Sequence, residues 1–373
     1  MRVTMVNSSM EGGGGERVMA TMANVWAGRG WPVTIVTLAE TPSFYPLAPG
    51  VEHVRLGLLG ASNSVPRAVA GNARRLARLR RAIRASRPDV VVSFLSPVNV
   101  QTLLATRGLG VPVIVEEHSD PTIEPIPSAW RELRRLSYRW AARVLVLSEV
   151  ARGYFPPGIR RNTDIMPNPI AVEPPAPGAP PVVPYRERRP GRRQLVSMGR
   201  FSEEKGFDLL VEAFGRIAAD LPEWDLVIWG EGVLRPELEA QRDRLGLAER
   251  VSLPGQTSTP HAKLREADLY ALPSRREGFP MALGEAMACG LPAVAFDLPS
   301  GPKALIRDGV DGVLVPNGDI GALAALLGSV MRDEPWRLRM AAEAPAVLSR
   351  YGVEAVMGRW DELLADVGAR ARG

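Results

Sequence analysis

The stretch RVTMVNSSMEGGGGERVMATMANVWAGRG, Arg2–Gly30, followed by VTIVTL, Val33–Leu38, decides the fold. A short apolar run leads into a polar, glycine-rich loop, then into a helical stretch and a second apolar run. This order predicts a β-α-β unit in which the glycine loop lies where the first strand passes into the first helix. We therefore expect a parallel sheet covered by helices.

Further apolar runs continue this alternation on both sides of a segment rich in proline and arginine. The runs before it are DVVVSFL, VPVIVEE and RVLVLS, and those after it are RQLVSMG, WDLVIWG, RVSLPG, DLYALPS and LPAVAFD. The segment between them, residues 168–193, cannot form a regular helix or an interior strand because its prolines lack the amide hydrogen that both require. The sequence thus predicts an α/β protein with two similarly built halves.

These features divide the chain into two domains and a linker. We expect an N-terminal Rossmann-like domain over residues 1–168, a linker over 169–192 and a C-terminal Rossmann-like domain over 193–351. The final segment, residues 352–373, predicts an amphipathic helix with Val356, Trp360, Leu363 and Leu364 on one side. This helix could pack on either half, and packing back onto the N-terminal domain is one of the two arrangements.

Composition favours a soluble protein of the reducing cytoplasm. The chain has 373 residues, 46% of them hydrophobic, which is enough for two domains that each bury a core. The start of the chain lacks an apolar stretch long enough for a signal peptide, and no apolar run is long enough to span a bilayer. Cys289 is the one cysteine, so the chain cannot form an internal disulfide.

The formal net charge of +5 raises the question of an anionic partner. Aromatic residues make up only 6% of the chain and do not alternate with basic ones, which argues against binding of nucleic acid strands. The segment Pro66–Arg87 carries eight arginines and no acidic residue, with an apolar stripe of Val69, Ala73, Leu76 and Ile83. Such a helix could rest on an anionic membrane surface, or it could bury its stripe and solvate its arginines.

The glycine loop, Gly12–Gly15, leaves backbone N–H groups free to approach an anion at a helix N-terminus. It does not match the dinucleotide-binding fingerprint, because Arg17 or Val18 stands where the third glycine is required. A flexible turn is the plain alternative. A nicotinamide-dependent dehydrogenase is only weakly supported.

The segment GRFSEEKGFD, Gly199–Asp208, again follows a strand and opens a helix. Its Arg200 and Lys205 could neutralise a diphosphate, with arginine binding oxygens in a fork and lysine acting as a point charge. Alternatively, both are solvated loop charges.

Two carboxylates lie close together in SRREGFPMALGEAMACGLPAVAFD, Ser274–Asp297. We expect Glu277 in a loop and Glu285 in the second turn of a helix that starts near Met281. One carboxylate could bind a ribose and the other a second sugar, while the free N–H groups of Met281, Ala282 and Leu283 could hold phosphate. This combination suits a nucleotide-sugar, although both glutamates could also be surface charges.

Four segments resemble the ordered motifs of the retaining GT-B glycosyltransferases of the family-four type. They are GGGGERV, GRFSEEKGFD, EGFPMALGEAMACGLPAVAFD and SGPKALIRDGVDGVLVPNGD. The resemblance runs over most of the chain and is strongest from Ser197 to Asp319. It implies a GT-B architecture, with two Rossmann-like domains whose parallel sheets face a central cleft.

The resemblance also implies a role for each matching residue. Glu277 would contact hydroxyls of the transferred sugar and Glu285 those of the ribose. Arg200 and Lys205 would stabilise the leaving diphosphate, which Gly13 and Gly14 would approach from the N-terminal domain, and His118 would meet the donor sugar. The implied catalytic residues are His118, Arg200, Lys205 and Glu277. The implied donor-binding residues are Gly13, Gly14, Arg200, Lys205, Glu277, Gly278, Phe279, Pro280, Met281, Ala282, Leu283 and Glu285.

We expect neither a metal ion nor another cofactor, because the chain contains no Asp-x-Asp triad to hold a metal-bound diphosphate. His118 stands beside Glu116, Glu117 and Asp120, so from the residues alone it could also be a structural histidine or half of a metal site.

The expected reaction is transfer of a hexose or N-acetylhexosamine from a UDP-sugar or another nucleotide-sugar to a hydroxyl group. The acceptor would be a sugar, a glycolipid or a small molecule, and the SGPKALIRDG segment resembles that of enzymes that build bacterial surface glycans. Ala304 and Leu305 depart from the family pattern there, which weakens the donor assignment.

We expect a cytoplasmic enzyme, with peripheral contact to the inner face of the cell membrane as an option. The alternatives are glycosylation of a soluble natural product, and a non-catalytic basic module that binds nucleotides or membranes.

Overall fold

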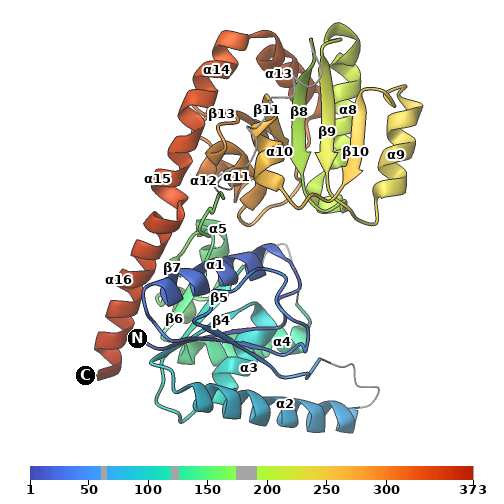
Figure 1. The fold of residues 1–373 in the computed structure, drawn as a ribbon. Coiled ribbons are helices and arrows are strands. Elements are labelled where there is room, and N and C mark those ends of the chain that lie inside the picture. The colour runs from blue at the N-terminus through green and yellow to red at the C-terminus, as the bar shows by residue number, and fades with distance from the viewer. Residues whose placement is uncertain (60–64, 119–125, 174–190, 373) are drawn as a thin grey trace. The chain divides into compact units, whose positions relative to one another are not determined.

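A computed structural model describes residues 1–59, 65–118, 126–173 and 191–372. The chain forms two compact units (Figure 1). The N-terminal unit contains Met1–Pro169 together with Glu354–Gly373, and the C-terminal unit contains Ile170–Val353. Each unit is described separately below.

The N-terminal unit is built on a parallel sheet with the strand order β3-β2-β1-β4-β5-β6-β7. The strands are β1 (Val3–Asn7), β2 (Val33–Thr37), β3 (Val51–Arg55), β4 (Val90–Phe94), β5 (Val113–Glu117), β6 (Arg143–Val146) and β7 (Thr163–Ile165). The helices are α1 (Gly14–Gly28), α2 (Val65–Ser86), α3 (Ser96–Thr106), α4 (Ser128–Ser137), η1 (Tyr138–Trp140), α5 (Glu149–Tyr154), α6 (Pro157–Arg160) and α16 (Val353–Arg372).

The central strands of this sheet are apolar runs because helices cover both of their faces. All five residues of β1, β2, β4 and β5 are buried. On one face, alternate side chains such as Val6, Val91 and Val115 form a core with Leu79 and Ile83 of α2, to which α3 and α4 also contribute.

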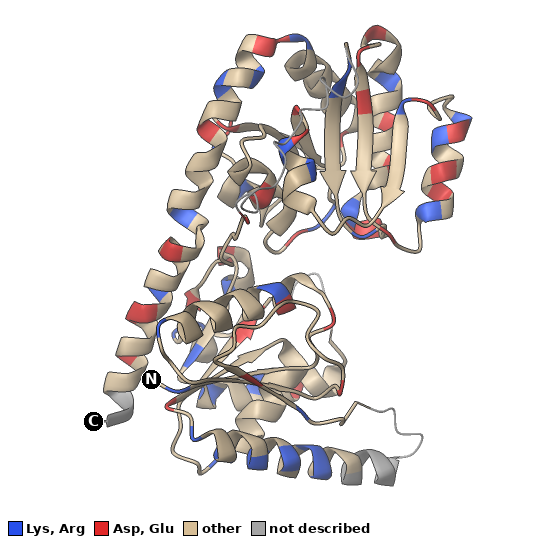
Figure 2. Cartoon of the chain, viewed as in Figure 1, with Lys and Arg blue, Asp and Glu red and all other residues tan. Residues whose placement is uncertain are grey.

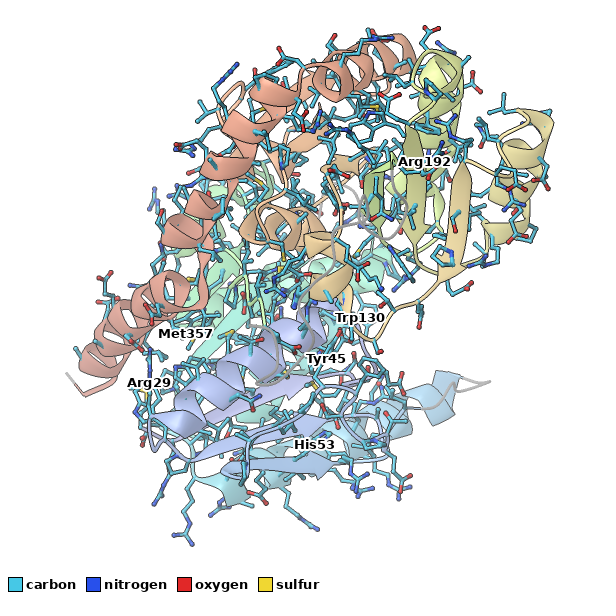
Figure 3. All side chains as sticks on the ribbon, turned by 45° about the horizontal axis from the view of Figure 1, so that its top comes forward. Arg29, Tyr45, His53, Trp130, Arg192 and Met357 are labelled. Carbon is cyan, nitrogen blue, oxygen red and sulfur yellow. The ribbon has the colours of Figure 1, made fainter. Side chains whose placement is uncertain are left out.

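On the opposite face lies α1, and the C-terminal helix α16 packs against α1 (Figure 1). Trp26 of α1 and Trp360 of α16 are both fully buried and meet edge to face, with 5.7 Å between their ring centroids. Arg29, at the end of α1, pairs with Asp361 of α16 at 2.7 Å (Figure 3). The helix expected over residues 352–373 therefore belongs to the N-terminal unit.

The C-terminal unit has a second parallel sheet, with the order β10-β9-β8-β11-β12-β13. Its strands are β8 (Arg193–Met198), β9 (Trp224–Trp229), β10 (Val251–Gly255), β11 (Leu269–Leu272), β12 (Ala293–Asp297) and β13 (Gly312–Pro316). Its helices are η2 (Glu203–Lys205), α8 (Phe207–Ile217), η3 (Ala218–Asp220), α9 (Arg235–Arg244), α10 (Pro260–Arg265), α11 (Met281–Ala288), α12 (Pro302–Leu305), α13 (Ile320–Arg332), α14 (Glu334–Glu343), η4 (Ala344–Ala346) and α15 (Val347–Tyr351).

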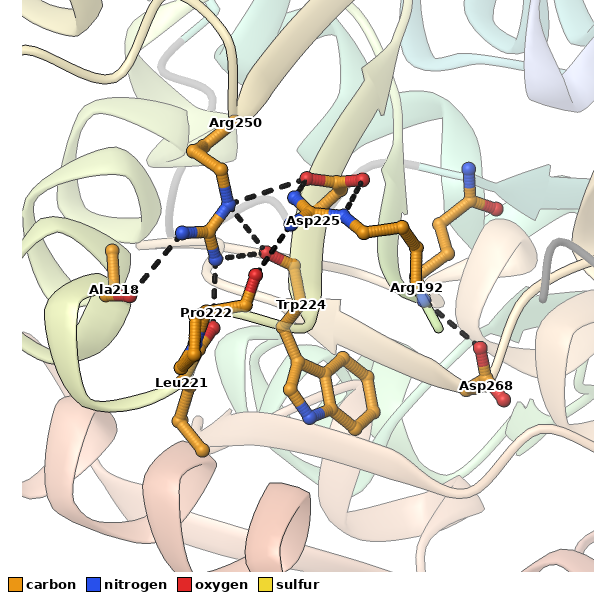
Figure 4. Close-up of polar contacts among 9 residues, drawn as sticks. Arg192, Ala218, Leu221, Pro222, Trp224, Asp225, Arg250 and Asp268 are labelled. Carbon is orange, nitrogen blue, oxygen red and sulfur yellow. Dashed lines mark hydrogen bonds and ion pairs between the residues drawn. The ribbon is translucent and has the colours of Figure 1, made fainter. Parts of the chain in front are cut away.

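A buried carboxylate holds two arginines where β8, β9 and β10 begin (Figure 4). Asp225 is 2% exposed and accepts hydrogen bonds from Arg192 Nε at 3.0 Å and from Arg250 Nε at 3.3 Å. Arg250 also donates to the carbonyl oxygens of Ala218 and Leu221 at 3.3 Å and 2.7 Å. Asp225 thus joins the amino ends of the three strands through the two arginines. Arg250 also satisfies carbonyl groups at the ends of α8 and η3 that lack a partner within their helices.

The structure adds strands that the sequence patterns did not indicate. These are β3, β7 and β13, which form edges of the two sheets. The predicted linker lies mostly within residues 174–190, outside the described residues. In α2, Ala73 was expected in the buried stripe but is exposed, and Leu79 is buried instead. The reason is helical geometry: Leu79 and Ile83 lie on one flank of Leu76, whereas Ala73 lies on the other.

Within the described residues, none of the helices combines the length and the hydropathy needed to cross a bilayer.

Candidate functional site

Each sheet has one point where the strand order reverses direction. In the N-terminal unit this switch point lies between β1 and β4, and in the C-terminal unit it lies between β8 and β11. Ligands of open parallel sheets bind outside the carboxyl ends of the strands at such points, where the loops from the two neighbouring strands diverge. The residues that the sequence singled out lie in the loops that follow these strands.

The loop after β8 carries the two predicted cations of the C-terminal unit. Arg200 is exposed, and its guanidinium makes no hydrogen bond or ion pair with another described residue. Lys205 ends the short helix η2 and is followed by Gly206, which has a φ of 65°. A Cβ atom at Gly206 would collide with the carbonyl oxygen of Pro273 in the loop after β11. Glycine is therefore required at residue 206, both for the turn and for the close approach of the two loops.

Glu277, in the loop after β11, is the centre of the polar contacts at this switch point. Its Oε1 accepts a hydrogen bond from Lys205 Nζ at 2.8 Å and from Ser274 Oγ at 2.7 Å. The Glu277 side chain is 8% exposed and that of Lys205 is 27% exposed. The structure therefore brings together two residues that the sequence assigned to different parts of the donor. Sequence reasoning missed Ser274, although it begins the quoted motif.

The Gly278-Phe279-Pro280 segment connects Glu277 to the start of α11. Phe279 packs edge to face on Tyr351, with 5.6 Å between the ring centroids, and Ser300 Oγ donates to the Glu277 carbonyl at 2.7 Å. These contacts fix the turn before the helix.

At the start of α11, the residues of the first turn are Met281, Ala282 and Leu283. Pro280 occupies the N-cap position and no side chain among the described residues caps this end. The N–H groups of the first turn therefore have no partner within the helix and can bind an anion.

Glu285 lies one turn further along α11 and is 3% exposed. His261 of α10 is its basic neighbour: His261 Nε2 lies 3.8 Å from Glu285 Oε2, and His261 Nδ1 accepts a hydrogen bond from the backbone N–H of Glu173 at 3.2 Å. Because Nδ1 is an acceptor, the neutral ring carries its proton on Nε2, on the side of Glu285. The sequence offered no partner for His261.

The pKa of Tyr270 on β11 depends on the charges of both glutamates. Burial raises the pKa of Tyr270, and the charges of Glu277 and, more weakly, Glu285 raise it further. Burial likewise raises the pKa of the Cys289 thiol to about 11, so this cysteine is neutral near pH 7 and is not a reactive nucleophile.

In the N-terminal unit, the glycine loop reaches the start of α1. Gly13 is the N-cap, and Gly14 and Gly15 already belong to the first helical turn. A Cβ atom at Gly13 would collide with Glu16 Oε2, so glycine allows this carboxylate to fold back over the helix start. An anionic ligand at this helix end would have to displace the Glu16 side chain.

His118 directly follows β5, and the glycine loop follows β1, so both lie at the carboxyl ends of the parallel strands. A Cβ atom at Gly15 would lie 3.7 Å from His118 Cγ, so the imidazole lies beside the first turn of α1. The ring stacks on Phe94, with centroids 4.9 Å apart, and its Nε2 lies 3.4 Å from Glu116 Oε2. The His118 side chain is 6% exposed.

A buried network that the sequence did not reveal lies behind His118. Glu117 is 3% exposed and accepts a short hydrogen bond from the hydroxyl of Tyr138, and its Oε1 lies 3.8 Å from Arg134 Nη1. Asn99 donates to the Tyr138 hydroxyl and to the Glu116 carbonyl, both at 3.0 Å. Burial raises the pKa of Glu117, although Tyr138 and Arg134 oppose this shift. The signal that the sequence offered was a pair of glutamates, Glu116 and Glu117, at the end of an otherwise apolar strand.

The described residues contain no group of three His, Cys, Asp or Glu side chains arranged to hold a metal ion. Among the neighbours that the sequence suggested for His118, Glu116 lies near the ring, Glu117 is engaged by Tyr138, and Asp120 lies outside the described residues. The predicted site residues thus form two groups. Gly13, Gly14 and His118 lie in the N-terminal unit, and Arg200, Lys205, the Glu277–Leu283 segment and Glu285 lie in the C-terminal unit.

Comparison with known families and proteins agrees with this architecture. Residues 13–176 match the glycosyl transferase 4-like domain, and residues 186–347 match glycosyl transferases group 1. A Campylobacter jejuni protein named for α-1,4-N-acetyl-D-galactosaminyl transfer to an undecaprenol-linked glycan is 27% identical over 368 residues, which cover 98% of this chain and 99% of that protein. The amylovoran biosynthesis glycosyltransferase AmsD of Erwinia amylovora is 25% identical over 367 residues, covering 96% of this chain and 98% of that protein.

Among solved structures, Anabaena HepE in complex with UDP and glucose superposes with a TM-score of 0.78 at 20% sequence identity, covering 98% of this chain and 100% of HepE. The two family matches together span most of the sequence, and the two parallel sheets have the GT-B architecture, so the chain belongs to the GT-B glycosyltransferases of the family-four type.

Proposed function

We propose that the protein is a retaining glycosyltransferase that moves a hexose or N-acetylhexosamine from a UDP-sugar to a hydroxyl group of a saccharide or glycolipid in bacterial glycan synthesis. The observation that carries this proposal is the pairing of Lys205 with Glu277 at the switch point of the C-terminal sheet. A cation and a nearly buried carboxylate at this position suit a diphosphate and a sugar, respectively. Arg200 in the same loop is exposed and makes no ion pair with another residue that the structure describes.

In this proposal, each group binds the part of the donor that its chemistry favours. Arg200 and Lys205 bind the diphosphate, and the first-turn N–H groups of α11 complement them. Glu277 accepts hydrogen bonds from hydroxyls of the transferred sugar, and Glu285 accepts them from the ribose. When the diphosphate arrives, Lys205 exchanges its ion pair with Glu277 for one with phosphate, and the freed carboxylate oxygen becomes available to the sugar.

The proposed transfer needs no protein nucleophile. The bond between the anomeric carbon and the diphosphate oxygen breaks, the acceptor oxygen bonds to the same face of that carbon, and the acceptor proton passes to the departing diphosphate. Arg200 and Lys205 stabilise the charge that develops on the diphosphate, which is where fixed cations lower the barrier most. Glu285 is not paired with Glu277 as an acid–base couple, since it lies buried in α11 beside His261.

The N-terminal unit is proposed to bind the acceptor and to place His118 at the donor sugar. Burial and the stacking contact with Phe94 hold the His118 ring in a defined position. The acceptor class is supported by the names of two relatives, one directed to an undecaprenol-linked glycan and one to amylovoran. The UDP preference is supported by the UDP complex of HepE.

The test is donor turnover by the full chain. Purified protein is incubated with UDP-, GDP- and ADP-sugars, with and without EDTA, and release of nucleoside diphosphate is measured. Glu277→Gln is compared with Glu362→Gln, since Glu362 is an exposed glutamate on α16. Donor binding is followed in parallel by thermal shift, and the anomeric configuration of any product is read by NMR.

Release of UDP from one donor, unchanged by EDTA and lost in Glu277→Gln but not in Glu362→Gln, would support the proposal. An inverted product would overturn the retaining mechanism, and EDTA sensitivity would overturn metal independence. Failure of every nucleotide-sugar to bind would overturn the donor assignment altogether.

A further inference from the structure

Two neighbouring glutamates end the strand β5. The fully described central strands β1, β2, β4 and β5 carry no charged residue other than Glu116 and Glu117 (Figure 2). Successive side chains of a strand point to opposite faces of the sheet. Glu117 bonds to Tyr138 on one face, whereas Glu116 lies on the other face with His118. The bond to Tyr138 accounts for the burial of Glu117, and Glu116 needs a partner of its own.

The backbone of Glu116 is held in place by two hydrogen bonds. Its carbonyl oxygen accepts them from the N–H of Leu95 and from the side-chain amide of Asn99, both at 3.0 Å. Glu116 is 1% exposed, and its Oε2 makes no hydrogen bond with any residue that the structure describes. A buried carboxylate oxygen in this state requires an explanation, because leaving it unbonded lowers stability.

The imidazole of His118 faces this oxygen. Its Nε2 lies 3.4 Å from Glu116 Oε2, and no other carboxylate of the described residues lies within ion-pair distance of the ring. This separation is slightly longer than a formed hydrogen bond, but the hydrogen bonds of catalytic groups are often long until the substrate binds. Both ring nitrogens are buried and make no hydrogen bond with the described residues. Water therefore does not compete with the carboxylate for Nε2.

The surroundings of His118 restrict rotation of the ring away from Glu116. The ring stacks on Phe94, which pairs in register with Glu116, and the two ring planes differ by only 15°. A Cβ atom at Gly15 would lie 3.7 Å from His118 Cγ and 4.0 Å from Nδ1, so the first turn of α1 also borders the ring. Nε2 thus stays beside Glu116, while Nδ1 lies beside the glycine-rich start of α1.

We propose that Glu116 is a positioning residue that keeps the proton of the neutral His118 ring on Nε2. An ionised carboxylate can only accept a hydrogen bond, so the nitrogen that faces it carries the hydrogen and the other nitrogen becomes an acceptor. His118 then offers Nδ1 as an acceptor beside the start of α1, where a hydroxyl of the donor sugar can donate to it. This contact with the sugar rests on the proposed function, whereas the tautomer does not.

Nuclear magnetic resonance measures the tautomer without any substrate. The full chain is labelled with ¹⁵N-histidine, and its three histidines are assigned with His53→Gln and His261→Gln. Glu116→Leu removes the carboxylate. Glu117→Gln is the matched control, because Glu117 is 3% exposed but lies on the opposite face of β5. We expect the Nε2–H tautomer of His118 in the wild type and the control, and a shift towards Nδ1–H in Glu116→Leu. Thermal unfolding checks that each variant is folded.

Steady-state kinetics measure the consequence for glycosyl transfer. Glu116→Leu should lower kcat about 10–100-fold and change the KM for the UDP-sugar by less than about twofold, because His118 acts on the reacting sugar and not on the nucleotide. Glu116→Gln should be intermediate, since its amide can either accept from Nε2–H or donate to Nε2. In a His118→Ala background, Glu116→Leu should have no further effect on kcat.

The proposal is overturned if wild-type His118 carries its proton on Nδ1 or on both nitrogens, or if Glu116→Leu leaves the tautomer unchanged. It is also overturned if Glu116→Leu lowers kcat as much in the His118→Ala background as in the wild type, because the carboxylate would then not act through the ring. If the wild type turns over no nucleotide-sugar, the proposed function fails, and the comparison of tautomers still decides the role of Glu116.

Discussion

Lys205 and Glu277, which are 72 residues apart in sequence, form an ion pair of 2.8 Å at the point where β8 and β11 lie side by side. The carboxylate is almost buried and the ammonium is partly exposed. Each residue therefore holds the other in position while no donor is bound.

Removing the cation tests this relationship. Lys205→Met should lower the free energy of unfolding by about 1–3 kcal/mol, because it leaves the Glu277 carboxylate without its countercharge. Donor turnover should fall by about 10²–10³ if Lys205 also stabilises the leaving diphosphate. Urea denaturation and nucleotide release measure the two effects.

The double variant Lys205→Met with Glu277→Gln separates stability from activity. It should regain most of the lost stability, since no unpaired charge remains, but it should not regain turnover. Recovery of both properties together would mean that the pair is purely structural.

The loop contact at Gly206 gives a second prediction. Gly206→Ala should destabilise the protein and lower donor binding, because the new methyl group would meet the Pro273 carbonyl oxygen in addition to the strain of a φ of 65°. Gly246→Ala is the control, since Gly246 has a φ of 69° but has no neighbouring atom within 4 Å of the new methyl group. The control should show only the backbone strain, about 1–2 kcal/mol. Equal losses in the two variants would refute the required close approach, and both losses can be read by thermal and urea unfolding.

The contact between His261 and Glu285 predicts a difference between two conservative substitutions. In His261→Gln, an amide nitrogen can still donate towards Glu285, whereas in His261→Asn the amide can only replace Nδ1, which accepts the Glu173 N–H. We expect His261→Asn to raise the KM for the nucleotide-sugar about three- to tenfold with little change in kcat, and His261→Gln to raise it less. The steady-state parameters of the two variants provide the measurement. A larger effect of His261→Gln would show that the bond to Glu173, not the contact with Glu285, is the important one.

The buried carboxylate of Glu117 predicts a pH dependence of stability. Its pKa in the folded protein is raised above the ordinary value of 4.5, chiefly by burial. The folded state therefore binds the proton more tightly than the unfolded state, so the contribution of this group is complete below about pH 4.5 and is lost as the pH rises through the raised pKa. Unfolding free energies measured over this window should fall more steeply with pH in the wild type than in Glu117→Gln, which cannot titrate. Parallel curves for the two proteins would contradict the raised pKa.

The sequence predicted the central strands because a parallel strand covered on both faces is a continuous apolar run, as in VTMVN of β1. Edge strands are covered less completely and carry polar residues. The run VEHVR of β3 is half exposed, and β7 is only three residues long, so neither had a distinctive pattern. The exposure of Ala73 shows the same limit, because a helix of many apolar and basic residues allows more than one choice of buried face.

The candidate site was predictable where its residues follow one strand. Arg200 and Lys205 stand in one loop, and Glu277 and Glu285 stand in one loop and helix, so residue type and spacing singled them out, whereas the family resemblance implied their roles. The bond between Lys205 and Glu277 was not predictable, because it depends on β8 and β11 being neighbours. The same is true of Glu117, Tyr138 and Asn99, whose network requires side chains from three elements that only the fold brings together.

The return of α16 to the N-terminal unit makes the C-terminal unit an insertion within it, since residues 170–353 interrupt a unit that resumes at Glu354. During synthesis the ribosome would therefore release the N-terminal sheet long before the helix that covers Trp26. The nascent chain would lack the Trp360 ring that packs on this tryptophan throughout translation of the inserted unit. The first part of the protein to emerge is thus completed only after the second has folded, and that interval is when the chain would most need a chaperone.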